Sequence, residues 1–217
     1  MRSGSVARIL ALSSVLALAC AKPHFPGYVI EPYEPETTPG DEAVLPPPTD
    51  LTARCREIVA IEVRKAERAL VARCADGDSV RVKAAFGREP RGRKRHRGDM
   101  RTPEGHYRVA GPPRESRFHL FVPLDYPSEA DAEAALAEGL ISEAERDAIL
   151  RARAEQRLPP QGTSLGGHIG LHGEGARWQG DSETGLNWTH GCVGMSDRDI
   201  EFLSSRVSTG TPVTILP

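Results

Sequence analysis

The sequence predicts a mainly β domain with short helices, an α+β fold, and three observations lead to this class. Apolar runs of strand length, such as "IVAIEV" (58–63) and "TPVTILP" (211–217), recur between turn residues. Helical patterns are confined to residues 128–158 and to a short segment after Ser196. The 217 residues include 21 Gly and 18 Pro, which indicates a globular chain with many turns.

The N-terminal segment has the order of an export signal. Arg2 and Arg8 precede an apolar run at 9–19, and Cys20 follows the run. The run is too short for a membrane-spanning helix, which needs about 20 apolar residues. We expect a signal peptide at 1–20 of the lipoprotein type, with lipidation of Cys20; simple secretion is the alternative. Because Ala21 rather than Asp follows the cysteine, the expected location is periplasmic, with an outer-membrane lipid anchor.

Residues 21–50 are rich in proline and acidic side chains and have no hydrophobic period, which predicts an extended linker. The folded domain is expected at 51–217. The formal net charge of the chain is -2, so its composition gives no reason to expect a nucleic-acid partner.

The first folded elements are predicted to be strands. The runs at 58–63 and 68–74 fit an antiparallel hairpin that holds Cys55 and Cys74 near its open end. In an exported protein these two cysteines can form a disulfide, and two buried free thiols are the alternative. Further strands are expected at 79–86, 106–111 and 118–126. A solvated basic loop is expected at 87–105, between the first two of these strands.

Two helices are predicted to follow as an insertion at 128–158. Ser128 has Asp131 three places on, and Ser142 has Glu145, so each helix begins with a capping-box pattern. Gly139 is a natural stop between them. We expect this pair to form a lid or wall beside a groove.

The segments "IGLHGEG" (169–175) and "NWTHGCVGMSD" (187–197) carry the candidate chemistry. A free thiol has a pKa of about 8.5, so Cys192 needs an imidazolium or a helix N-terminus to be a thiolate at neutral pH. His172 is the candidate base, and a helix is predicted after Ser196. A zinc site of His168, His172, His190 and Cys192 is an alternative. The glycines argue against a helix here, but on a strand His168 and His172 would still point the same way. A buried structural cysteine is another.

These segments resemble the L,D-transpeptidase catalytic-domain (YkuD-type) family. The family signature is His-Gly and, after a gap, Ser/Thr-His-Gly-Cys, and here 16 residues separate His172 from Thr189. "GDMRTPEGHYRV" (98–109) and "GTPVTI" (210–215) resemble two further family elements, so the match runs from about 58 to 215. The resemblance implies a mixed β-sandwich with the two-helix insertion beside the active-site groove.

The resemblance also implies the roles of the site residues. Cys192 would attack the carbonyl of a stem-peptide diaminopimelate, release D-Ala and form a thioester acyl-enzyme. His172 would activate the thiol, with the carbonyl of Gly173 as the third partner. The amides of Gly191 and Cys192 would form the oxyanion hole. Five residues would contact the substrate: His190, Thr189, His168, Tyr107 and Trp188.

One position departs from the family pattern. Many members have Arg two places after the cysteine, where a guanidinium can hold a substrate carboxylate, but this chain has Gly194. Arg177, Arg93 or Lys94 could supply the cation, although each is expected to be a solvated charge. This departure leaves the acyl acceptor open.

The sequence therefore predicts a cysteine L,D-transpeptidase that acts on peptidoglycan stem peptides and forms cross-links or attaches proteins to the wall. An L,D-carboxypeptidase or amidase that hydrolyses the same acyl-enzyme is the first alternative. A non-catalytic cell-wall-binding lipoprotein is the second. The expected partners are stem peptides, wall-attached proteins and, through the lipid, the membrane. Neither a cofactor nor a metal is expected.

Overall fold

The computed structural model describes residues 55–217. The predicted signal peptide at 1–20, the lipidation site Cys20 and the linker at 21–50 lie outside the described residues, so they stay predictions. Within residues 55–217, no helix is both long and apolar enough to cross a bilayer.

The described chain forms two β-sheets and four short helices, which confirms the predicted α+β class. The five-stranded sheet has the order β3-β2-β1-β9-β4, with strands at Ser79–Lys83, Ala69–Cys74, Ile58–Arg64, Pro212–Leu216 and Gly105–Arg108. The four-stranded sheet has the order β5-β6-β7-β8, with strands at Arg114–Ser116, His119–Pro123, Gly170–His172 and Val193–Gly194. The helices are α2 (Glu129–Ala137), α3 (Glu143–Ala154), α4 (Asp181–Thr184) and α5 (Asp197–Ser204).

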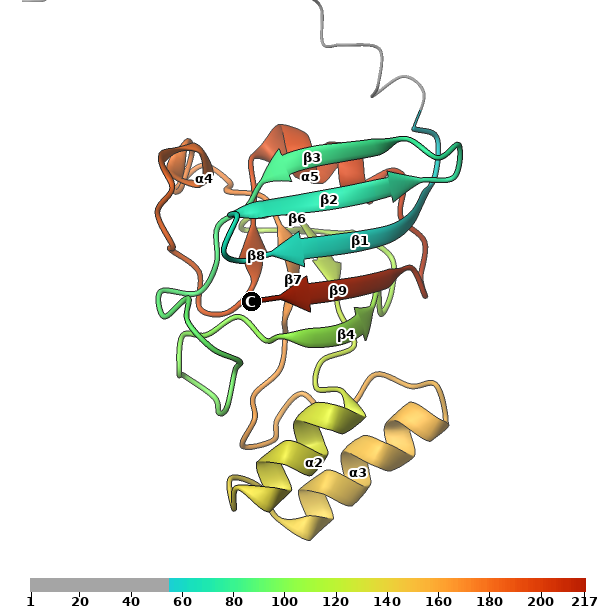
Figure 1. The fold of residues 1–217 in the computed structure, drawn as a ribbon, viewed down its shortest axis with the longest axis vertical. Helices are drawn as coiled ribbons and strands as arrows, with labels where there is room; N and C mark the ends of the chain where they lie inside the picture. Colours follow the sequence, from blue (N-terminus) through green and yellow to red (C-terminus); the bar gives the residue numbers. More distant parts are fainter. Residues whose placement is uncertain (1–54) are drawn as a thin grey trace, which may run out of the picture. The chain divides into compact units, whose positions relative to one another are not determined.

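The two sheets lie one behind the other and share one hydrophobic core (Figure 1). In β1 and β9 the apolar side chains alternate, so Val63 and Ile215 are buried on the inner face. The second sheet contributes Leu171 and Val193, and α5 contributes Leu203. The last strand, β9, lies between β1, to which it is parallel, and β4, to which it is antiparallel.

The chain joins the two sheets directly after β3. Ala85 and Gly194 exchange both backbone hydrogen bonds, each 2.8 Å long. The predicted strand at 79–86 therefore leaves the first sheet after Lys83, and its end pairs with β8 of the second. This places the chain that follows Cys192 against the core.

The first hairpin has the predicted cysteines at its open end. Ile58 pairs with Cys74 in the antiparallel β1–β2 ladder. A disulfide links Cys55 to Cys74, with the two Cα atoms 5.3 Å apart. The bridge attaches the start of the described chain to β2.

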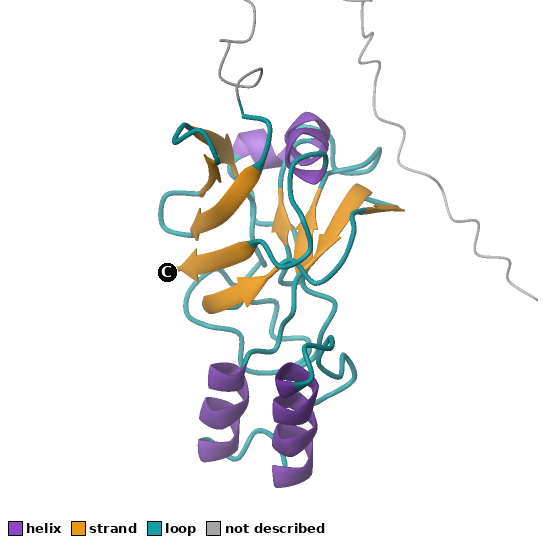
Figure 2. Cartoon of the chain, turned by 90° about the vertical axis from the view of Figure 1, so that its right-hand side faces the viewer, coloured by secondary structure: helices purple, strands orange, loops and turns teal. Residues whose placement is uncertain are grey.

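The helices α2 and α3 lie side by side at one end of the molecule, beyond the edge strand β4 (Figures 1 and 2). Both capping boxes form, at Ser128 with Asp131 and at Ser142 with Glu145. The helix pair contacts the basic loop, because Arg93 and Arg95 both pair with a glutamate at the end of α2, Glu138.

Candidate active site

The strands β7 and β8 bring the predicted histidine and cysteine together. These strands are parallel, with Leu171 opposite Val193 and His172 opposite Gly194. By this register Cys192 comes level with Gly170. Cys192 directly precedes β8, so the backbone register brings it close to β7, two positions from the level of His172.

His172 is a buried base with a defined tautomer. Its Nδ1 lies 2.7 Å from the carbonyl oxygen of Gly173. A carbonyl only accepts, so the proton is on Nδ1 and the Nε2 lone pair is free. Burial lowers the pKa of His172 to about 4; the bond to Gly173 opposes this shift, and the charge of Arg117 adds to it.

Cys192 is partly exposed, and its Sγ lies 3.5 Å from the carbonyl oxygen of His168. Burial of the thiol raises the pKa of Cys192 to about 11, against smaller opposing effects of the Gly170 backbone and the charge of Lys94. Both shifts favour the uncharged forms of the two side chains, whereas the sequence reasoning asked for a neighbouring imidazolium or helix N-terminus to hold a thiolate. Desolvation is the largest cause of both pKa shifts, so it favours a neutral thiol and a neutral imidazole at neutral pH.

The turn before the cysteine is held by Thr189. Its hydroxyl donates to the carbonyl of Cys192 at 2.7 Å and accepts from the amide of Gly191 at 3.1 Å. Gly191 has φ 132°, and a Cβ there would lie 2.7 Å from the carbonyl oxygen of Arg101, so only glycine fits. To act as an oxyanion donor, the Gly191 amide has to leave the Thr189 hydroxyl.

The other predicted substrate contacts divide into two groups. His168, whose φ is 56°, and His190 are both exposed. The carbonyl of His168 contacts Sγ of Cys192, and His190 lies two residues before Cys192 in the chain. Trp188 is buried beside His172. Tyr107 instead lies in the core. Its hydroxyl donates to Asp131 at 3.0 Å, at the start of α2. The structure does not bring Tyr107 to the residues around Cys192.

Aromatic rings surround the candidate base. Phe118 stacks on His172 with ring centroids 4.3 Å apart, and Trp188 meets His172 edge-on at 5.2 Å. Trp178 stacks on Trp188 at 5.3 Å. We call Phe118, His172, Trp188 and Trp178 the aromatic wall. Sequence reasoning missed Phe118, because an aromatic residue in an apolar run looks like core.

The three side chains that could supply the cation missing at position 194 have different surroundings. Lys94 was expected to be solvated, but it is 3% exposed and pairs with Asp99 at 2.8 Å, so that expectation is wrong. The basic loop folds back on itself, which encloses this ion pair. Arg93 pairs with Glu138, and the guanidinium of Arg177 lies 5.0 Å from the ring centre of Trp178.

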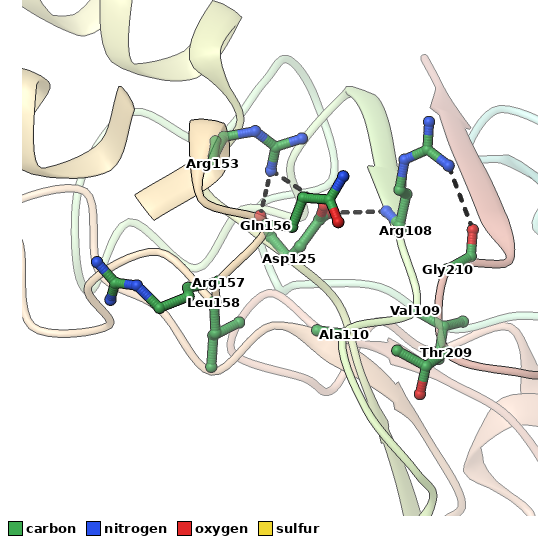
Figure 3. A pocket seen from close by; sticks show the side chains of 10 residues that line it. All are labelled: Arg108, Val109, Ala110, Asp125, Arg153, Gln156, Arg157, Leu158, Thr209 and Gly210. Atoms are coloured by element: carbon green, nitrogen blue, oxygen red, sulfur yellow. Dashed lines mark hydrogen bonds and ion pairs between the residues drawn. The ribbon is translucent and has the colours of Figure 1, made fainter. Parts of the chain in front are cut away.

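A separate hollow lies away from the cysteine. It has a volume of about 590 Å³ and lies between the end of β4, the end of α3 and the turn before β9 (Figure 3). Asp125 occupies its centre, where it accepts from the Arg108 amide and pairs with the Arg153 guanidinium. None of the predicted site residues lines this hollow. Within the described residues, no cluster of histidine, cysteine and acidic side chains has an arrangement that could hold a metal ion.

A histidine and a cysteine on neighbouring parallel strands, with the histidine oriented by its own backbone, define a candidate thiol site on a two-sheet α+β fold. The L,D-transpeptidase catalytic-domain family model matches residues 58–215. The chain therefore belongs to the L,D-transpeptidase catalytic-domain family, as the sequence resemblance predicted.

The solved structures similar to this chain include several L,D-transpeptidases. The chain is 14% identical to one from Mycobacterium smegmatis (TM-score 0.42, covering 73% of this chain and 58% of that one). It is 17% identical to one from Xylanimonas cellulosilytica (TM-score 0.37, 75% and 62%). It is 16% identical to L,D-transpeptidase 3 from Mycobacterium tuberculosis, solved with a faropenem-derived adduct (TM-score 0.41, 74% and 60%). The chain thus spans 58–62% of these three proteins. No curated protein sequence matches it.

Proposed function

We propose that this protein is a cysteine L,D-transpeptidase that acts on peptidoglycan stem peptides through a thioester acyl-enzyme. The observation that carries the proposal is the 2.7 Å bond from His172 Nδ1 to the Gly173 carbonyl, which leaves Nε2 as the basic nitrogen on a strand paired with the one that follows Cys192. Family membership supports the same reaction class.

In the first half-reaction, Nε2 of His172 takes the thiol proton while Sγ of Cys192 attacks the scissile carbonyl carbon. The carbon–nitrogen bond then breaks. The departing amine of D-Ala takes the proton from Nε2, and a thioester remains on Cys192. Because the thiol and the imidazole are both uncharged before the reaction, proton transfer and attack occur together. The bound substrate excludes water from the site, and no water is needed to solvate a charged thiolate–imidazolium pair.

In the second half-reaction, an amine attacks the thioester carbonyl and gives its proton to Nε2. Collapse of the tetrahedral intermediate forms the new amide, and Sγ leaves and takes the proton back. The negative charge on the carbonyl oxygen needs amide donors, and Cys192 and Gly191 carry the nearest candidates in the chain. If water attacks instead, the same site is an L,D-carboxypeptidase or amidase.

A penem or carbapenem tests the nucleophile. After incubation with faropenem or imipenem, intact mass spectrometry is expected to find one adduct, and peptide mapping to place it on Cys192. Cys192→Ser removes the adduct, and His172→Ala slows its formation by about 10²–10⁴-fold, the usual contribution of a general base. An adduct on another residue, or an unchanged adduct in Cys192→Ser, contradicts the proposal.

Product analysis on purified muropeptides tests the acceptor. Cross-linked dimers support transfer to an amine, shortened monomers support hydrolysis, and released protein supports cleavage of a wall attachment. All three products require Cys192. A wall-remodelling activity that survives Cys192→Ala would instead favour a non-catalytic wall-binding role.

The proposed location is the periplasm, with the chain anchored through a lipid on Cys20. Several acyl chains on one cysteine would hold the protein firmly at a membrane. Mass spectrometry of the N-terminal peptide from membrane fractions tests this. A free, unmodified N-terminus at or beyond residue 20 in a soluble periplasmic fraction contradicts lipidation.

A further inference from the structure

Trp188 holds an unpaired hydrogen-bond donor inside the candidate active site. The residue is 6% exposed, yet its indole Nε1 finds no hydrogen-bond partner within the described part of the chain. Buried N–H groups without partners are uncommon in folded proteins, since each loses its bonds to water and gains none. Next to a candidate catalytic histidine, such a donor points to a bond made with a ligand.

Gly194 makes room for the indole. A Cβ at Gly194 would lie 2.7 Å from Cζ2 of Trp188 and 3.2 Å from Cε2, the carbon bonded to Nε1. The donor edge of the ring therefore lies over the backbone of β8, where Gly194 pairs with His172. Any side chain at 194 would push this edge away, so the glycine and the unpaired donor form one arrangement.

No charged side chain hydrogen-bonds to this donor within the described residues. Trp188 packs on the rings of Trp178, Phe118 and His172. The guanidiniums of Arg117 and Arg177 lie over the outer rings of the wall, at 4.7 Å from the centre of Phe118 and 5.0 Å from that of Trp178. A carboxylate bound at the indole would lose its hydration without a direct counter-charge, whereas a neutral amide oxygen would need only the N–H.

We propose that the Trp188 indole N–H is a specificity-determining donor for an uncharged carbonyl oxygen of the acyl-donor peptide. The enzyme is then selective for donors in which the side-chain carboxyl nearest the scissile bond is a carboxamide rather than a carboxylate. This inference rests on the proposed function and names the substrate class of the same site.

Nuclear magnetic resonance tests the hydrogen bond directly. The chain has two tryptophans, so ¹⁵N-labelled Cys192→Ala protein gives two indole signals, and Trp178→Phe assigns them. Two synthetic stem tetrapeptides that differ only in a side-chain carboxamide or carboxylate serve as ligands. The carboxamide peptide is expected to move the Trp188 indole proton downfield. An unmoved Trp188 signal at saturation, or an equal shift with the carboxylate peptide, overturns the proposal.

Kinetics with the same two peptides test the specificity. Wild-type kcat/KM for D-Ala release is expected to favour the carboxamide by about tenfold, the effect of one hydrogen bond. Trp188→Phe brings the ratio close to one, while Trp178→Phe, which keeps the Trp188 indole N–H, keeps the preference for the carboxamide. If Trp188→Phe does not fold, the wild-type ratio and the indole shift still decide.

The failures of the two proposals are distinguishable. If the wild-type protein releases D-Ala from neither peptide and forms no adduct with a penem, the proposed function fails and this inference with it. If it releases D-Ala equally from both, or favours the carboxylate, only the role of Trp188 is overturned.

Discussion

His172 and Cys192 share an enclosure that disfavours both of their charged forms. Burial lowers the pKa of the imidazole to about 4 and raises that of the thiol to about 11. The shift of the thiol pKa favours the less reactive protonated form, since the thiolate is the reactive species. In the proposed mechanism, reactivity appears when a bound acyl donor completes the site and accepts electron density from sulfur.

The resting state of the thiol predicts its pH dependence. The rate at which iodoacetamide alkylates Cys192 is expected to rise about tenfold per pH unit from pH 7 to pH 10, because the thiolate fraction rises by that factor below the pKa. Peptide mapping of the alkylated residue measures this rate at Cys192 alone. A plateau near neutral pH would reveal a thiolate–imidazolium pair and contradict the neutral resting state.

The buried imidazole predicts an acid-dependent loss of stability. Its pKa is about 4 in the folded chain and 6.5 for the free group, so the unfolded chain binds the extra proton as the pH falls through this window. The free energy of unfolding is expected to decrease by on the order of 3 kcal/mol between pH 6.5 and pH 4.

Urea unfolding of the wild-type protein and of His172→Gln measures this effect. The glutamine does not titrate, so the variant is expected to lose the His172 contribution to the pH slope whatever its overall stability. Equal slopes in the two proteins between pH 4 and pH 6.5 would show that His172 is accessible to protons in the folded state.

At the scale of elements, the start of α2 explains the place of Tyr107. Asp131 accepts from the amide and hydroxyl of Ser128 and from the Tyr107 hydroxyl. The tyrosine therefore attaches β4 to the helical insertion. In the sequence it belongs to a motif that resembles a family element, which is why it looked like a substrate contact.

Tyr107→Phe tests this structural role. Removal of the hydroxyl leaves a buried carboxylate with one donor fewer, and the free energy of unfolding is expected to fall by about 1–3 kcal/mol. The rate of penem adduct formation at Cys192 stays within about twofold of wild type. An unchanged stability with a large loss of acylation would place Tyr107 at the substrate instead.

Elements with strong local signals could be predicted, and those defined by tertiary contacts could not. The capping boxes at Ser128 and Ser142 form as predicted, because each needs only residues three positions apart. The strands β7 and β8 have three and two residues, too few to show a period. Their register, which brings the histidine and cysteine together, is set by pairing across 20 residues of chain.

The electrostatic state of the site could not be predicted either. Motif spacing identified Cys192 and His172, but the neutral pair depends on burial by residues far along the chain, such as Phe118. The unpaired indole of Trp188 is equally invisible in sequence, because it is defined by a missing contact. Lys94 shows the same limit: a basic run suggests solvent, and only the folded loop reveals the buried partner Asp99.

At the scale of the whole molecule, the Cys55–Cys74 disulfide closes a loop with a sequence separation of 19. A bridge of that loop length is expected to stabilise the fold by about 3 kcal/mol, mainly through the unfolded chain. Urea unfolding with and without reductant measures the difference, and the double variant Cys55→Ala, Cys74→Ala serves as the reductant-insensitive control. Equal midpoints with and without reductant in the wild-type protein would contradict this stabilisation.

The atom that orients His172 is a main-chain oxygen, and this has an evolutionary consequence. A third catalytic partner that is a side chain can be lost by one codon change, whereas every amino acid at position 173 supplies a carbonyl. Selection at this position acts on bulk: a Cβ on Gly173 would lie 2.8 Å from the Phe118 carbonyl oxygen and 2.9 Å from Cγ2 of Ile200. A change of residue at 173 would therefore disturb this packing while keeping a carbonyl that can fix the tautomer.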